Sequence, residues 1–279
     1  MPELPEVEIT RQRIAPLLVG RKIAALKTTA PSYFFITAPD ALRRGLVGKE
    51  LTGLRRRGKY LIGALSDGQQ LLLHLGMTGQ LFSSRAKSVR LLSSTARASL
   101  APEEQGDFEP DRHTHVQFLF NDDGPEVYFR DVRKFGKILL LAPGEQNKRL
   151  ERLGGDALEI TGEHLFAATR KRKTPIKALL LDQSVVAGIG NIYADEALFY
   201  SRIRPGRRAA SMTKKQCEDI AKEVRRVLER SIATGGSSIS DYISPDGSDG
   251  KYQDERRVYA RTGQACFECQ TPIRRKLVA

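Results

Sequence analysis

The sequence predicts an α+β protein of two domains, a β-sandwich that follows an opening helix and a second half built mainly of helices. Short β-type runs separated by turn signals fill residues 21–82 and 113–142. After about residue 155 the apolar residues recur instead at the three- and four-residue spacing of helices. A length of 279 residues suits two domains of ordinary size. Their apolar runs all fall short of the ~18–20 residues that a membrane-spanning helix needs.

Residues 2–19 are expected to form the opening helix. Pro5 suits a first helical turn, and Glu3 and Glu6 suit the positive end of the helix dipole. Gly20 is a typical residue to end it.

The sandwich is expected to be built from short strands joined by tight turns. Asp67-Gly68 and Asp123-Gly124 are typical of hairpin turns. The strands expected include Tyr60–Leu65, Leu71–His74, Val116–Phe120, Val127–Phe129 and Ile138–Leu141. Residues 83–112 interrupt this pattern with a Ser/Arg/Ala-rich stretch and then an acidic one. They are interpreted as a partly disordered surface insertion, for which a solvated loop is favoured over a DNA contact.

Residues 174–201 and 211–234 of the second half are predicted to be helical. Thr213 and Gln216 have the spacing of a capping box, and Gly235-Gly236 would stop the second helix. A short β-like piece is expected at Arg257–Ala260. The resulting domains are a sandwich at 1–142, a hinge at 143–155, a helical domain at 156–236, a loop at 237–256 and a C-terminal segment at 257–279.

The chain is strongly basic. Lys and Arg number 46 against 33 Asp and Glu, which gives a net charge of +13 and a pI near 9.8. Such a balance indicates a polyanionic partner, most commonly nucleic acid, although a dispersed basic surface is the alternative. Three cysteines and the absence of a signal sequence in MPELPEVEIT favour a reducing cytoplasm.

The amino terminus carries potential chemistry. A Met before Pro is normally excised, which would leave Pro2 as a free secondary amine. An α-amino group has a pKa near 8, against roughly 10.4 for lysine, so it is a better nucleophile at neutral pH. Its attack on an aldehyde-level carbon gives an iminium, and Glu3 and Glu6 could serve as acid or base. The alternative is an ordinary first helical turn, where Pro and Glu are common.

Six motifs occur in order along the chain: MPELPEVE at 1–8, RGKYL at 57–61, HLGMTG at 74–79, RHTHV at 112–116, DVRKFG at 131–136 and GIGNIYA at 188–194. Together they closely resemble the bacterial formamidopyrimidine-DNA glycosylase family, over nearly all of the chain except 83–112 and the extreme C-terminus. Leu4 separates it from the similar endonuclease VIII family, which usually has Gly at that position.

The resemblance implies a catalytic group. Pro2 corresponds to the nucleophile that attacks C1′ of the damaged nucleoside and forms a Schiff base. Glu3 corresponds to the acid that assists sugar opening, Glu6 has a supporting role, and Lys59 matches the catalytic lysine.

The resemblance also implies a DNA-binding set and a helix–two-turns–helix motif around Gly188–Asn191. Met77, Arg133 and Phe135 match the three residues that fill the gap left by a flipped base, with Arg133 bonding the orphaned cytosine. The positions expected to contact phosphates are His74, His113, Arg172, Lys173 and Asn191. A loop at Gly235–Tyr252 would cover the everted base.

A zinc finger closes the family's pattern, with two C-x2-C pairs about sixteen residues apart. Cys266 and Cys269 supply the first pair, and the chain stops at Ala279 before the second. A structural Zn²⁺ site needs four ligands, so only a half-site is implied. Either the sequence is truncated, which is favoured, or the protein lost its finger. The missing part would hold an arginine that the resemblance links to δ-elimination.

The expected function is excision of oxidised purines, such as 8-oxoguanine and formamidopyrimidines, from duplex DNA, with β- and δ-elimination of the abasic site. The alternatives are an endonuclease VIII-like pyrimidine glycosylase and a non-catalytic binder of damaged DNA. The expected partner is damaged double-stranded DNA, bound by a monomer without a redox cofactor or a membrane.

Overall fold

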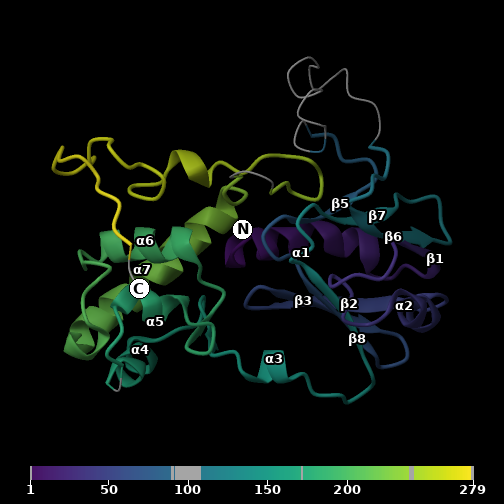
Figure 1. Cartoon of the computed structure of the whole chain (residues 1–279), viewed down its shortest axis with the longest axis horizontal. Coiled ribbons are helices and arrows are strands. Elements are labelled where there is room, and N and C mark those ends of the chain that lie inside the picture. The colour runs from purple at the N-terminus through teal and green to yellow at the C-terminus, as the bar shows by residue number, and fades with distance from the viewer. Residues whose placement is uncertain (1, 89–90, 92–107, 171, 239–241, 278–279) are drawn as a thin grey trace. The chain divides into compact units, whose positions relative to one another are not determined.

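The computed structural model describes residues 2–88, 91, 108–170, 172–238 and 242–277, and it forms two compact units (Figure 1). The first unit contains Met1–Asn147 together with Gly235–Lys251, and the second contains Lys148–Thr234 together with Tyr252–Ala279. The first unit is therefore discontinuous, because the chain leaves it after residue 147 and returns for residues 235–251. Most of the predicted insertion, at 89–90 and 92–107, and residues 239–241 of the predicted loop lie outside the described residues.

Two four-stranded antiparallel sheets and the helix α1 (Leu4–Leu18) organise the first unit. One sheet has the order β2-β3-β4-β8 and the other β1-β6-β7-β5. The strands are β1 (Ile23–Thr28), β2 (Leu51–Arg57), β3 (Tyr60–Leu65), β4 (Gln70–His74), β5 (Gly79–Ser83), β6 (Thr114–Phe120), β7 (Val127–Asp131) and β8 (Lys137–Leu141). The predicted sandwich is thus confirmed, and the five predicted strands are present with ends shifted by up to two residues.

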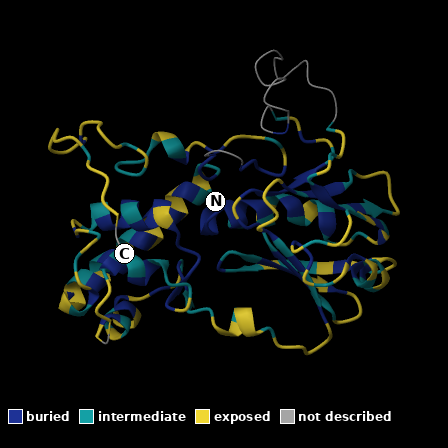
Figure 2. Ribbon diagram, viewed as in Figure 1, coloured by how far each residue is buried: buried dark blue, intermediate teal, exposed yellow. Residues whose placement is uncertain are grey.

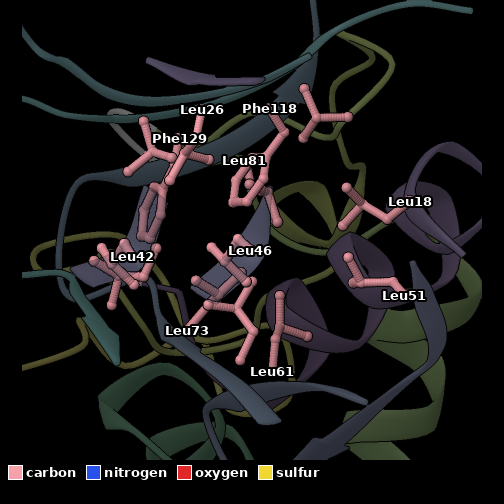
Figure 3. Packing of buried hydrophobic residues seen from close by; sticks show 14 of the residues in the cluster. Leu18, Leu26, Leu42, Leu46, Leu51, Leu61, Leu73, Leu81, Phe118 and Phe129 are labelled. Atoms are coloured by element: carbon pink, nitrogen blue, oxygen red, sulfur yellow. The ribbon is translucent and has the colours of Figure 1, made fainter. Parts of the chain in front are cut away.

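The core of the first unit lies between the two sheets and against α1. Leucines from β2, β3 and β4 meet Phe118 and Phe129 of the other sheet in one buried cluster (Figure 3). Leu18 of α1 belongs to the same cluster. Because each of these side chains is removed from water, their burial is the main force that holds α1 to the strands.

A short helix, α2 (Pro39–Leu46), lies where only β-type runs were expected. Pro39 occupies its first turn, a position where proline loses no hydrogen bond. Leu42 and Leu46 are spaced by four and are both fully buried. The helix was missed because two leucines over eight positions are too weak a periodic signal.

The second unit is helical apart from one small parallel pair of strands, β9 (Gly155–Asp156) and β10 (Val186–Ala187). Its helices are α3 (Lys148–Glu151), α4 (Gly162–Thr169), α5 (Ile176–Leu181), α6 (Asn191–Tyr200) and α7 (Lys214–Ala233), with the single 3-10 turns η3 (Ala209–Ser211) and η4 (Tyr252–Asp254). Thr213 and Gln216 form the predicted capping box of α7. Buried and exposed residues alternate along α7 (Figure 2), which packs against α4 and α6.

The predicted helical region at 174–201 contains two helices, α5 and α6, which are separated by the turn at residues 183–185, β10 and residues 188–190. The side chain of Gln183 stabilises the break. Its amide nitrogen donates to the carbonyl of Ile189 at 2.8 Å, and its oxygen accepts the Gly188 N–H at 3.0 Å. Gly188 has φ of 110°, a conformation that a side chain would strain.

The predicted β-like piece at Arg257–Ala260 is also wrong, because these residues form turns. Their backbone N–H groups point at Glu196, a fully buried carboxylate of α6. It accepts from Arg257 at 2.8 Å and from Val258 and Tyr259 at 2.9 Å. The Glu196 side chain therefore accepts the hydrogen bonds that a neighbouring strand would otherwise accept.

Among the described residues, no helix is both long and apolar enough to span a bilayer.

Candidate active site

The first turn of α1 places two carboxylates beside Pro2. Pro2, Glu3 and Glu6 are all buried, Glu3 and Glu6 with 2% and 1% of their surface exposed. Glu3 is the N-cap of the helix, and Glu6 Oε2 accepts its backbone N–H at 2.9 Å. This capping box satisfies backbone donors that every helix start leaves unpaired. Pro2 therefore directly precedes the capped first turn of α1.

The second oxygen of Glu6 connects α1 to the returning segment 235–251. Glu6 Oε1 accepts the N–H of Ser237 at 2.9 Å. Gly236 lies so close that a Cβ there would stand 3.3 Å from the same oxygen and 3.1 Å from Ile9. The segment that is predicted to cover the base is thus fixed at its start to the helix that follows Pro2.

Tyr242 anchors the same segment further along. Its hydroxyl donates to the backbone carbonyl of Glu6 at 3.0 Å, and the Thr10 hydroxyl donates to that carbonyl at 2.8 Å. Burial raises the pKa of Tyr242, so the hydroxyl stays protonated and remains a donor. Ser237 and Tyr242 therefore hold the segment on both sides of residues 239–241.

Lys59 completes this group from the turn between β2 and β3. Gly58, with φ of 55°, forms the turn that brings the lysine into place. Burial lowers the pKa of the Lys59 ammonium, and the nearby charges of Glu3 and Glu6 partly offset this effect. Pro2, Glu3, Glu6 and Lys59 thus gather in one place, with a lysine that releases its proton more readily than an exposed one.

Two loops lie against each other at one end of the sandwich, residues 75–79 and 131–136. A Cβ on Gly76 would stand 2.4 Å from the backbone of both Phe135 and Gly136, so only glycine permits this approach. Met77 is carried by the first loop and Arg133 and Phe135 by the second. The structure therefore brings the three predicted gap-filling residues into neighbouring loops.

Asp131 sets the shape of the second loop. Its fully buried carboxylate accepts the Arg133 N–H at 3.2 Å, the Gly136 N–H at 2.6 Å and the hydroxyl of Thr78 from the other loop. Sequence reasoning missed Asp131, although its place at the start of a glycine-ended polar loop is a usual position for such a residue.

The side chains of these loops remain accessible. Met77 and Phe135 are 38% and 37% exposed, although each belongs to a loop whose backbone is closely packed. The Arg133 guanidinium lies 4.6 Å from the centre of the Phe135 ring. A stacked arginine and an exposed ring on a rigid loop are suited to insertion between bases.

His74 and His113 lie near these loops. His74 Nδ1 accepts the N–H of Gly76 at 3.1 Å, which leaves the proton of the neutral ring on Nε2. His113 is half-buried, and its carbonyl accepts the N–H of Asp131 at 2.9 Å. Burial lowers the pKa of His113, and Asp111 opposes this effect. The lowered pKa of His113 favours its neutral imidazole.

His115, which was not predicted as a site residue, is fully buried behind the second loop. Its Nε2 lies 2.9 Å from the carbonyl of Asp131 and its Nδ1 lies 3.0 Å from the Thr29 hydroxyl. It supports the loop and does not face solvent.

The second unit holds the remaining predicted phosphate contacts. Asn191 is the exposed first residue of α6, directly after the glycine-rich turn that Gln183 stabilises. Lys173 is exposed, whereas Arg172 pairs with Asp182 at 3.2 Å. The N–H groups and dipole at the start of α6 favour an anion there.

The C-terminal cysteines fit only part of a zinc site. Cys266 and Cys269 lie on one turn, in which the Gln270 N–H donates to the Cys266 carbonyl at 3.0 Å. Hydrogen bonds with Thr271 and with Cys266 lower the pKa of the Cys269 thiol. Within the described ranges, no group of three or more His, Cys, Asp or Glu is placed to hold a metal ion. The residues present therefore do not fit a four-ligand zinc site.

Family models match most of this chain, and known proteins match nearly all of it. The model of the formamidopyrimidine-DNA glycosylase N-terminal domain covers residues 1–138, and that of the family's H2TH domain covers 153–243. Formamidopyrimidine-DNA glycosylases of Paracoccus denitrificans and Moorella thermoacetica are 41% and 40% identical. These alignments cover 95% and 99% of this chain and 90% and 94% of the relatives.

Solved structures of formamidopyrimidine-DNA glycosylases have the same fold as this chain. The MutM (Fpg) protein of Thermus thermophilus has a TM-score of 0.82 at 34% identity, covering 100% of this chain and 94% of that one. A Lactococcus lactis Fpg mutant in complex with DNA containing Fapy-dG has a TM-score of 0.83 at 31% identity, covering 100% and 95%. Fold and matches together define a DNA glycosylase and abasic-site lyase of base excision repair. The chain belongs to the formamidopyrimidine-DNA glycosylase family.

Proposed function

We propose that this protein excises oxidised purines from duplex DNA and cleaves the resulting abasic site, with Pro2 as the nucleophile. The observation that carries the proposal is the gathering of Glu3, Glu6 and Lys59 around the amino terminus. Its substrates would be 8-oxoguanine and formamidopyrimidines. In support, a relative of this fold was solved with DNA containing Fapy-dG, and another with carbocyclic 8-oxoguanine DNA.

The chemistry follows from an amine that is unprotonated at neutral pH in a far larger fraction than a lysine side chain. After removal of Met1, the Pro2 nitrogen bonds to C1′ while the base leaves and takes up a proton. Opening of the sugar gives an iminium, which makes the C2′ hydrogen acidic. Loss of that proton expels the 3′ phosphate, and a second elimination expels the 5′ phosphate. Water then releases Pro2 and the sugar fragment, so the enzyme is restored.

The carboxylates have different roles in this proposal. Each oxygen of Glu6 accepts a backbone N–H, from Glu3 and from Ser237, so Glu6 is a positioning residue. Glu3 adjoins Pro2 in the chain and is the acid that protonates the sugar oxygen as the ring opens. Lys59, with its lowered pKa, exchanges a proton with the leaving base.

Reaching the base requires that it leave the helix, which costs a few kcal/mol in lost stacking and pairing. We propose that Met77, Arg133 and Phe135 fill the vacated space, and that Arg133 hydrogen-bonds the cytosine left behind. His74, His113, Arg172, Lys173 and Asn191 contact phosphates of the same duplex. The net charge of +13 is consistent with this partner.

We further propose that the protein acts as a monomer in the bacterial cytoplasm, because one chain carries every residue used above. No step is assigned to zinc.

Matched duplexes test the substrate. One carries 8-oxoguanine opposite cytosine, the second carries thymine glycol opposite adenine, and the third carries a preformed abasic site. The proposal predicts fast release of 8-oxoguanine, slow release of thymine glycol and covalent trapping by borohydride on the abasic duplex. Preference for thymine glycol would instead indicate an endonuclease VIII-like enzyme. Tight binding of all three duplexes without trapping would indicate a non-catalytic binder.

A further inference from the structure

Tyr33 is the most exposed of the large aromatic residues near the gap-filling loops, with 60% of its surface accessible. Its ring centre lies 6.4 Å from that of Phe135, with the two planes at 81°. The Nζ atom of Lys137 lies 3.4 Å from the centre of the Tyr33 ring. Arg133, Phe135, Tyr33 and Lys137 therefore form a continuous row in which two cations flank two rings.

The chain holds Tyr33 rigidly in this row. The next residue, Phe34, is fully buried, with its ring centre 4.8 Å from those of both His115 and Phe129. A Cβ on Gly136 would stand 3.2 Å from the Phe34 ring, so the Tyr33 backbone is tied to the loop that carries Phe135.

The neighbouring backbone fixes the segment further. Ile36 donates its N–H to the carbonyl of Ile138 at 3.0 Å, and Ile138 donates to Phe34 at 3.3 Å. The segment therefore extends the sheet beside β8, which orients Phe34 inward and leaves the Tyr33 ring at the surface.

An exposed aromatic ring between cations has the chemistry that binds a nucleic-acid strand. Bases of an unpaired or locally opened strand stack on aromatic side chains while nearby cations contact the phosphates. We propose that Tyr33 is a second stacking residue, which holds a base of the strand opposite the lesion next to the place that Phe135 occupies. The proposal rests on the proposed function for the presence of a flipped base, and nucleic acid is the one occupant that it assigns.

Binding measurements separate stacking from other roles of the tyrosine. Tyr33→Phe keeps the ring, Tyr33→Ala removes it, and Val47→Ala alters an apolar residue of similar exposure, 40%, after α2. The probe is a duplex with a tetrahydrofuran abasic analogue opposite cytosine, bound to the full-length protein and followed by fluorescence anisotropy. Tyr33→Ala is expected to weaken binding at least about fivefold, whereas the Phe and Val47→Ala variants stay within about twofold of wild type. The thermal unfolding midpoints of all variants should agree with that of the wild type, because Tyr33 and Val47 are both exposed.

A second readout reports the base itself. 2-Aminopurine is placed in the opposite strand next to the orphaned cytosine, first on one side and then on the other. Stacking quenches its fluorescence, so on one side the Tyr33→Ala complex should be brighter than the Tyr33→Phe complex.

The inference is overturned if Tyr33→Ala binds within twofold of wild type. It is equally overturned if Tyr33→Phe loses as much affinity as Tyr33→Ala, because that result would assign the effect to the hydroxyl. Neither measurement needs catalysis. Borohydride trapping by the wild type, carried out in parallel, therefore reports separately on the proposed function.

Discussion

The carboxylate of Glu6 accepts the backbone N–H of Ser237 at 2.9 Å, although 231 positions separate the two residues. The same carboxylate accepts the N–H of Glu3 and so completes the cap of α1. One buried charge therefore sets both the start of the helix that bears Pro2 and the start of the segment expected to cover the base.

Replacement of Glu6 by glutamine is expected to break one of these two contacts. The side chain keeps its shape, but its NH₂ group would face a backbone N–H, and neither can accept. Leaving a buried donor unsatisfied costs about 1–3 kcal/mol. Urea unfolding should show a loss of that size, and 8-oxoguanine release should slow more than cleavage of an abasic site. Equal slowing of both reactions would contradict a role in holding segment 235–251.

Lys59 gives the protein a pH-dependent stability whose sign is fixed by its lowered pKa. Above that lowered pKa and below the ordinary value near 10.4, the unfolded chain holds a proton that the folded chain has released. The unfolding free energy contributed by Lys59 must therefore rise with pH in this window. Comparing the wild type with Lys59→Met by urea unfolding from pH 7 to pH 10 isolates this contribution. The wild type should gain stability relative to the variant as the pH rises, and a constant difference would contradict the lowered pKa.

Asp131 is predicted to control the orientation of Arg133 without touching DNA. Asp131→Asn replaces one acceptor oxygen by a donor, although Thr78, Arg133 and Gly136 all donate to the carboxylate. The expected result is a fall in the preference for cytosine opposite the lesion, because Arg133 loses its fixed backbone. The measurement is the ratio of 8-oxoguanine release opposite cytosine to release opposite adenine. Arg133→Ala serves as the reference, and an unchanged ratio in Asp131→Asn would show that the loop is held by other contacts.

Variants at two neighbouring cations, Arg172 and Lys173, should differ in their DNA affinity and in how it depends on salt. Lys173 is exposed, so Lys173→Ala should lower the slope of log affinity against log salt by about 0.9. Arg172 is paired with Asp182 and must give up that pair to reach a phosphate. Asp182→Asn should therefore tighten DNA binding, and Arg172→Ala should cost less than Lys173→Ala. Weaker binding by Asp182→Asn would indicate that the ion pair holds Arg172 in its binding position.

The parts of the fold that the sequence predicts well are those with long or repeated signals. The strands around Tyr60–Leu65 and Ile138–Leu141 and the capping box at Thr213 are present as expected. The errors occur where a single side chain replaces regular structure. Gln183 stabilises the break between α5 and α6 inside the predicted helical region, and Glu196 takes the hydrogen bonds of the expected strand at 257–260. Such long-range partners leave no periodic pattern in the sequence.

The residues of the candidate site also fall into those whose role the sequence predicts and those whose role it does not. Pro2, Glu3 and Lys59 stand in motifs, and the structure brings them together. Asp131 and His115 also stand in those motifs, but their support of the loop depends on contacts across the sheet. Tyr33 stands in no motif, and only its exposure beside Phe135 draws attention to it.

The central claim is that the amino-terminal amine of Pro2 bonds to deoxyribose. The direct measurement is borohydride trapping on 8-oxoguanine DNA, followed by proteolysis and mass spectrometry of the cross-linked peptide. The account predicts a protein that has lost Met1, with the sugar fragment on the nitrogen of Pro2. An adduct on Lys59, or full strand cleavage by a protein whose amino terminus is blocked, would contradict it.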